Sequence, residues 1–152
     1  MFETVVLGRQ CSDKEFRKTA PDLRMKLFEA QRQCIERKIP LLITIAGIDG
    51  SGRGEVVNLL SEWMDGKYVH NHVFRLETDE EKARPQDWRY WRLLPAAGTV
   101  GVFFGGWYGP AMRRYCTGDM SEMEFNAHMT HYSGLEEALA ASGMAIAKIW
   151  LH

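Results

Sequence analysis

The stretch over residues 41–54, LLITIAGIDGSGRG, decides the fold. Its first part, residues 41–46, is apolar and β-branched, which is typical of a strand buried on both faces of a parallel sheet. A glycine-rich turn follows over 47–54, and residues 55–64 repeat apolar side chains at helical spacing. A strand, a glycine turn and a helix in this order provide the context of a phosphate-binding loop (P-loop), whose backbone N–H groups converge at a helix N-terminus.

The turn has the glycine spacing of a P-loop, but Arg53 and Gly54 stand where a lysine and a hydroxyl residue are usual. Arginine keeps the positive charge on a bulkier, planar head. The missing hydroxyl removes one usual Mg²⁺ ligand. The same glycines would also suit a tight strand–helix turn that binds nothing. The candidate phosphate-binding residues of the turn are Gly47, Gly50, Ser51, Gly52, Arg53 and Gly54.

Asp49 lies inside the turn and has two equally plausible roles. It could hold Mg²⁺ directly or through water, since Mg²⁺ prefers carboxylates and retained waters. It could instead accept hydrogen bonds from the turn's own N–H groups, as aspartate often does. Asp49 is therefore the candidate metal ligand and, with Arg53, a candidate catalytic residue.

Helical patterns precede this stretch. Ser12 and Glu15 have the spacing of a capping box, and Pro21 is expected in the first turn of the main N-terminal helix. Pro40 ends that helix. The chain is thus predicted to be a single domain over 1–152, with a helical segment over 1–40 and a βα core over 41–152.

Strands and helices alternate after residue 64. Further strands are predicted over 73–76, 99–104 and 144–151, and helices around 88–94, up to residue 112, and over 121–141. This alternation predicts an α/β three-layer sandwich with a mainly parallel sheet and helices on both faces. Ligands bind beyond the carboxyl ends of such strands. Because the last predicted strand ends the chain, we expect a further strand and a lid to follow in a longer protein.

Residues 84–92, RPQDWRYWR, interleave cations with aromatic rings. Such a surface would suit a linear polyanion or a nucleotide. An amphipathic helix with Trp88 and Trp91 in the core and solvated arginines explains the tryptophans better. Arg89 and Arg92, three positions apart, remain candidate phosphate contacts.

The third predicted strand ends in Phe103 and Phe104, followed by two glycines. A phosphotransferase would end this strand in an aspartate that holds Mg²⁺, whereas these residues can neither bind a metal nor accept a proton. The five histidines show no metal-ligand spacing. His128 and His131 are predicted to be surface or helix-packing residues.

Composition limits the remaining classes. A length of 152 residues with 26% charged and 45% hydrophobic residues indicates one globular domain. A net charge of −1 disfavours a general nucleic-acid binder, so any anion site must be local. No apolar run approaches the roughly 18–20 residues of a membrane span, and the N-terminus does not have the pattern of a secretory signal. With three cysteines and no CxxC pair, a cytoplasmic protein is expected.

Four blocks in order, 45–54, 84–95, 101–108 and 147–152, resemble the type-2 polyphosphate kinase family. The resemblance implies a P-loop kinase fold that moves phosphate between inorganic polyphosphate and nucleotides with Mg²⁺. The family's loop pattern, G-x-D-x-x-G-K-G, is matched at Asp49, while Arg53 replaces the lysine. Its later pattern, F-D-R-S-W-Y, is matched at Trp107 and Tyr108. The positions of its Asp, Arg and Ser are taken by Phe104, Gly105 and Gly106.

These departures resemble the degenerate N-terminal half of tandem members, the polyphosphate:AMP phosphotransferases. That resemblance implies polyphosphate and AMP or ADP as ligands, a second catalytic domain in the same polypeptide, and a homo-oligomer. The chain would then take part in converting polyphosphate and AMP to ADP. Alternatively, it is an inactive pseudo-kinase domain with a structural, dimerisation or polyphosphate-binding role. An ATP-dependent nucleoside monophosphate kinase fits the loop but does not account for the later blocks.

Overall fold

A computed structural model of the chain describes residues 11–152. The strands are β1 (Leu41–Gly47), β2 (Val69–Val73), β3 (Val100–Phe104) and β4 (Ala145–Leu151). They form one sheet in the order β2-β3-β1-β4, and every neighbouring pair is parallel. The absence of a secretory signal and the start of the N-terminal segment were predicted from residues 1–10, which lie outside the described residues.

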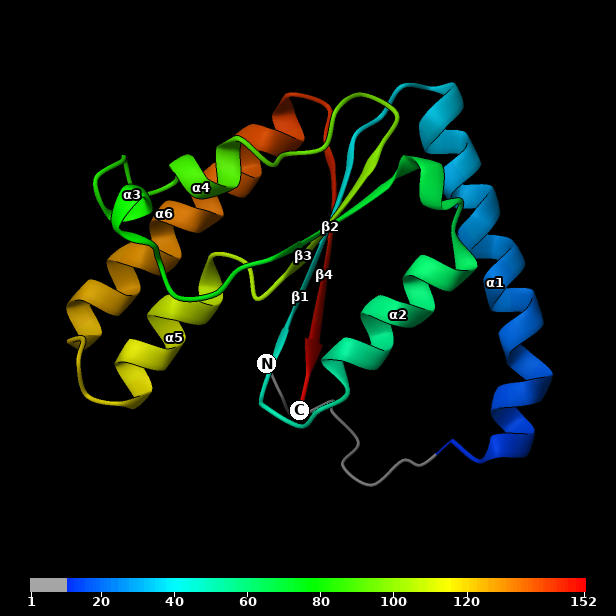
Figure 1. Ribbon diagram of the computed structural model, residues 1–152, viewed down its shortest axis with the longest axis horizontal. Helices are drawn as coiled ribbons and strands as arrows, with labels where there is room; N and C mark the ends of the chain where they lie inside the picture. Colours follow the sequence, from blue (N-terminus) through cyan, green and yellow to red (C-terminus); the bar gives the residue numbers. More distant parts are fainter. Residues whose placement is uncertain (1–10) are drawn as a thin grey trace.

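Helices cover both faces of this sheet, as the sequence predicted (Figure 1). One face carries α1 (Asp13–Glu36) and α2 (Arg53–Trp63). A short 3₁₀ turn, η1 (Gly66–Tyr68), connects α2 to β2. The other face carries α3 (Asp79–Lys82), α4 (Trp88–Trp91), α5 (Tyr108–Cys116) and α6 (Glu122–Ala141). The α/β three-layer prediction is confirmed. None of the helices described in residues 11–152 has both the length and the apolar character needed to cross a membrane.

The central strand β1 explains why the core has two halves. Successive side chains of a strand point to opposite faces, so Leu42 joins one cluster and Ile43 joins the other. The cluster beneath α4, α5 and α6 is rich in aromatic rings, among them Phe103 and Trp107. The cluster beneath α1 and α2 is aliphatic. Burial on both faces is the reason that β1 is apolar along its length except for the buried Thr44.

Two local predictions are wrong. The second strand is β2, not 73–76, because β2 is an edge strand whose polar residues, such as His70 and His72, give no apolar run. Helix α1 begins at Asp13, so Pro21 lies inside it rather than in its first turn. Ser12 and Glu15 close a complete capping box that fixes the true start of α1.

At the carboxyl end of β1, Gly47 lets two strands approach unusually closely. A Cβ atom on Gly47 would lie 2.0 Å from the carbonyl oxygen of Leu151 on β4, and the φ angle of Gly47 is +147°. The next residue, Ile48, donates its backbone N–H to that same oxygen over 3.1 Å. Only glycine fits here, and its position sets where the glycine-rich turn leaves the sheet.

Replacing Gly47 by alanine is expected to lower the free energy of unfolding by about 3 kcal/mol, because the new Cβ clashes with backbone and strains φ. Gly134→Ala is the matched control, since a Cβ there meets no atom within 4 Å. That control lies within α6 and is expected to raise stability by up to about 1 kcal/mol. Urea unfolding measures both, and equal stability of the two variants would contradict the close approach.

Candidate functional site

The candidate site lies where β1, β3 and β4 end, at the edge marked by the C-terminus in Figure 1. The turn between β1 and α2 passes through Gly50 and Gly52, with φ angles of +82° and +84°. These are left-handed conformations that glycine adopts without steric cost. Gly52 is also the N-cap of α2, so the turn runs directly into the N-terminus of a helix.

Backbone N–H groups of this turn are open to an anion. Ser51 closes the turn, donating its N–H and its hydroxyl to the carbonyl oxygen of Ile48 over 3.3 and 2.8 Å. Several N–H groups have no acceptor among residues 11–152, namely those of Asp49, Gly50, Gly52, Arg53 and Gly54. Open N–H groups at a helix N-terminus favour phosphate, because they add to the positive end of the helix dipole.

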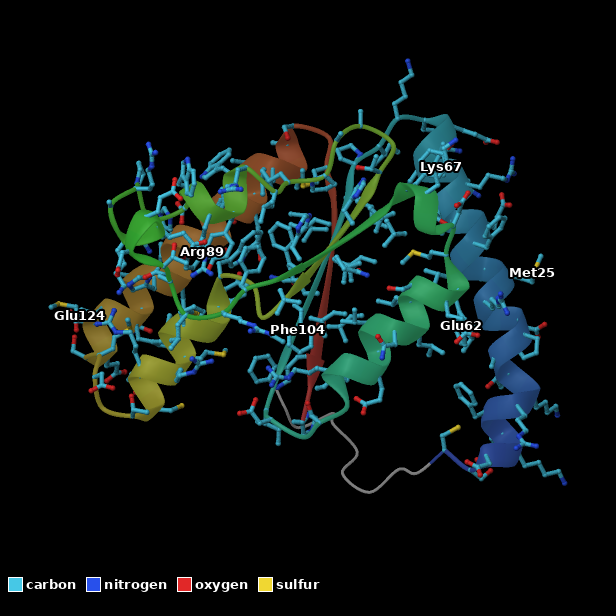
Figure 2. All side chains as sticks on the ribbon, viewed as in Figure 1. Met25, Glu62, Lys67, Arg89, Phe104 and Glu124 are labelled. Carbon is cyan, nitrogen blue, oxygen red and sulfur yellow. The ribbon has the colours of Figure 1, made fainter. Side chains whose placement is uncertain are left out.

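The structure brings Asp49, Arg53 and Phe104 together. Arg53 forms an ion pair with the Asp49 carboxylate. Its guanidinium carbon also lies 5.3 Å from the centre of the Phe104 ring at the end of β3, within the range of a cation–π interaction. The Arg53 side chain is only 20% exposed, whereas that of Asp49 is fully exposed. Figure 2 shows Phe104 between the sheet and the start of α2.

The residues at this edge do not fit a resident Mg²⁺ ion. Mg²⁺ is usually held by one or two carboxylates together with substrate phosphates. The carboxylate of Asp49 is already paired with Arg53, and β3 continues into Phe104, Gly105 and Gly106. Within residues 11–152 there is no group of three or more His, Cys, Asp or Glu side chains that could hold a metal.

A largely buried glutamate, 11% exposed, supports the turn after β3. Glu136 on α6 accepts hydrogen bonds from Trp107 Nε1 over 3.1 Å and from Lys148 Nζ over 2.7 Å. The hydrogen bond that Lys148 donates to the Glu136 carboxylate raises the pKa of Lys148. Lys148 also lies 5.5 Å from the centre of the Tyr108 ring. Sequence reasoning missed Glu136, because a single glutamate in an amphipathic helix carries no local signal of such a role.

Arg89 is buried in the β2–α4 segment rather than solvated. Its side chain is 5% exposed and donates to the carbonyl oxygen of Arg75 over 2.9 Å. Glu81 and Glu77 lie 3.4 and 3.9 Å from its guanidinium nitrogens. Phe74 stacks against it at 5.4 Å. Figure 2 shows Arg89 beside α4, away from Phe104 at the sheet edge.

Arg92 differs from Arg89 in its surroundings. It is exposed, and its guanidinium carbon lies 4.8 Å from the centre of the Trp88 ring. The two arginines therefore do not share a solvent-facing surface. The expected core position of Trp91 is also wrong: this side chain is 54% exposed, and Tyr90 occupies the core. The helix is a single turn, so helical spacing could not identify its inward side.

The two histidines of α6 hold that helix against the α4 segment. His131 Nε2 lies 2.7 Å from Asp87 Oδ2, and His128 Nδ1 lies 3.2 Å from the side-chain amide of Gln86. Gln86 also donates to the hydroxyl of Tyr132 over 3.3 Å. This matches the predicted helix-packing role of His128 and His131.

A parallel sheet whose central strand runs through a glycine-rich turn into a helix defines a P-loop kinase-like protein. The chain belongs to the polyphosphate kinase 2 (PPK2) family, whose sequence model matches residues 10–152. This fold matches a solved structure from Pseudomonas aeruginosa PA01 with a TM-score of 0.91 and 35% identity, covering 100% of this chain and 33% of that one. It also matches Polyphosphate Kinase 2 from Arthrobacter aurescens TC1, with a TM-score of 0.86 and 26% identity, covering 96% and 53% of the two chains.

Two curated relatives are named polyphosphate:AMP phosphotransferase. The protein from Pseudomonas syringae pv. tomato is 39% identical over 100% of this chain. The one from Pseudomonas aeruginosa is 35% identical over 100% of this chain. In each case this chain spans 31% of the relative's length.

Arg89→Ala is expected to lower the free energy of unfolding by about 2 kcal/mol, because it leaves Glu77 and Glu81 without their buried partner and removes packing against Phe74. Arg92→Ala is the matched control and is expected to change stability by no more than about 0.5 kcal/mol. Thermal and urea unfolding measure both. Equal stability of Arg89→Ala and the unaltered chain would contradict a stabilising role for the buried contacts of Arg89.

Proposed function

We propose that this chain is a phosphate-binding domain of a polyphosphate:AMP phosphotransferase and that it does not itself transfer phosphate. The whole protein would pass a terminal phosphoryl group from polyphosphate to AMP, giving ADP. The observation that carries this proposal is the end of β3, where Phe104 stands under the Arg53 guanidinium in place of a metal-binding carboxylate.

Phosphoryl transfer depends on positioning and on neutralising the charge of the transferred group. In this chain the groups that can neutralise negative charge on a phosphate are Arg53 and the open N–H groups of the turn. These can hold a phosphate chain. They would not supply the charge of a metal ion, because β3 ends in Phe104, followed by Gly105 and Gly106, and places no carboxylate next to the turn that carries Asp49.

The ligand class follows from the relatives. The names of the relatives from both Pseudomonas species specify polyphosphate and AMP. Of the six predicted residues, we assign phosphate binding to Gly50, Gly52, Arg53 and Gly54, whose N–H groups are open in the turn and the first turn of α2. Gly47 ends β1, and Ser51 uses its N–H and its hydroxyl on the carbonyl oxygen of Ile48, so these two are secondary candidates. Arg92 is exposed and remains a secondary candidate, whereas Arg89 would have to leave its buried contacts with Glu81 and Arg75 first.

Catalysis would take place in a second domain of the same polypeptide. The relatives are about three times as long as this chain, which leaves room for such a domain. That domain would hold the Mg²⁺ ion that the residues at this edge do not fit. The chain would then be one domain of a tandem protein, and assembly into a homo-oligomer belongs to the same proposal.

The purified chain, given polyphosphate, AMP and Mg²⁺, is expected to form no ADP above a protein-free control, because it has no anchor for the metal. Chromatographic detection of ADP measures this. ADP formation that Asp49→Ala abolishes would contradict the proposal, since it would place turnover in this turn. ADP that persists unchanged in Asp49→Ala would instead indicate a contaminating kinase.

A further inference from the structure

Asp49 forms an ion pair with Arg53, which is the cation that a bound phosphate chain would also contact. Arg53 is the basic side chain at the turn, and it contacts the Asp49 carboxylate, four residues before it, and the Phe104 ring at the end of β3. A phosphate bound to the open N–H groups would lie next to the same guanidinium. The Asp49 carboxylate therefore competes with that phosphate for one partner.

We propose that Asp49 is an autoinhibitory competitor in the turn, and that the ligand with which it competes for Arg53 is polyphosphate free of metal. This inference rests on the proposed phosphate-binding function and adds how the site is regulated. It assigns Asp49 a role opposite to that of a metal ligand, because removing the carboxylate would strengthen phosphate binding rather than weaken it.

The two contacts of Arg53 differ in whether they leave its N–H donors free to bind phosphate. An aromatic ring covers one face of a guanidinium, while the N–H donors lie in the guanidinium plane and stay free to bind in the manner of a fork. Stacking on Phe104 thus holds Arg53 at the sheet edge without using its donors. The carboxylate of Asp49 instead accepts a hydrogen bond from one of these donors, on Nη2 of Arg53.

Displacing Asp49 costs little. Its side chain is fully exposed, and exposed ion pairs contribute little because water and salt screen them. A polyphosphate chain carries one negative charge on each phosphate unit, and two oxygens of one phosphate can accept a guanidinium bidentately. The carboxylate would therefore reduce affinity by a small factor without closing the site.

The test is calorimetric binding of a short polyphosphate to the unaltered chain and to three variants, in EDTA and at constant ionic strength. Asp49→Asn is expected to bind about threefold more tightly. Asp79→Asn is the matched control, because Asp79 is equally exposed and forms an i,i+3 ion pair with Lys82 elsewhere on the surface. It is expected to leave the affinity unchanged.

Arg53→Ala is expected to weaken binding about tenfold or more.

The outcomes separate the inference from the proposed function. Equal tightening by Asp49→Asn and Asp79→Asn would overturn the inference, since net charge alone would then explain the effect. Weaker binding by Asp49→Asn, or binding only when Mg²⁺ replaces EDTA, would overturn it in favour of a metal-ligand role. Either result leaves phosphate binding intact. Absence of binding by every form would overturn both the inference and the phosphate-binding function.

Discussion

Burial of β1 on both faces is the constraint on which the rest of the structure depends. This strand lies between β3 and β4, it is apolar except for the buried Thr44, and its side chains contribute to both halves of the core. Its last residue, Gly47, packs so closely against the carbonyl oxygen of Leu151 that only glycine fits there. This close contact fixes the point at which the chain leaves the sheet. The packing of β1 therefore places the glycine-rich turn and the N-terminus of α2 at the edge of the sheet where the strands have their carboxyl ends.

What stands at that edge decides the chemistry. In this chain Phe104 extends the aromatic core to the sheet edge and gives Arg53 a ring to lie against. A carboxylate at the same place would repel Asp49 and attract a metal ion, whereas an aromatic ring does neither. The result is a turn that keeps its N–H groups and its positive charge. In the function proposed above, these groups bind phosphate and no metal ion is held beside them.

The sequence predicted the layers and most elements, because β1, the helix after it and the capping boxes at Ser12 and Ser121 are governed by local rules. It failed at β2, where an edge strand carries polar residues, and at α4, where one turn is too short for periodicity to show an inward side. The contacts of Arg53 with Phe104 and of Glu136 with Lys148 join distant segments, so no local pattern could reveal them.

The central claim is that this edge offers polyphosphate a cation but no metal anchor. Its most direct test is a calorimetric titration of Mg²⁺ into short polyphosphate, alone and after saturation with the chain. The account predicts that the chain does not tighten Mg²⁺ binding, because Arg53 rather than a protein–metal contact meets the phosphate charge. Tighter Mg²⁺ binding in the presence of the chain, lost in Asp49→Asn, would contradict it.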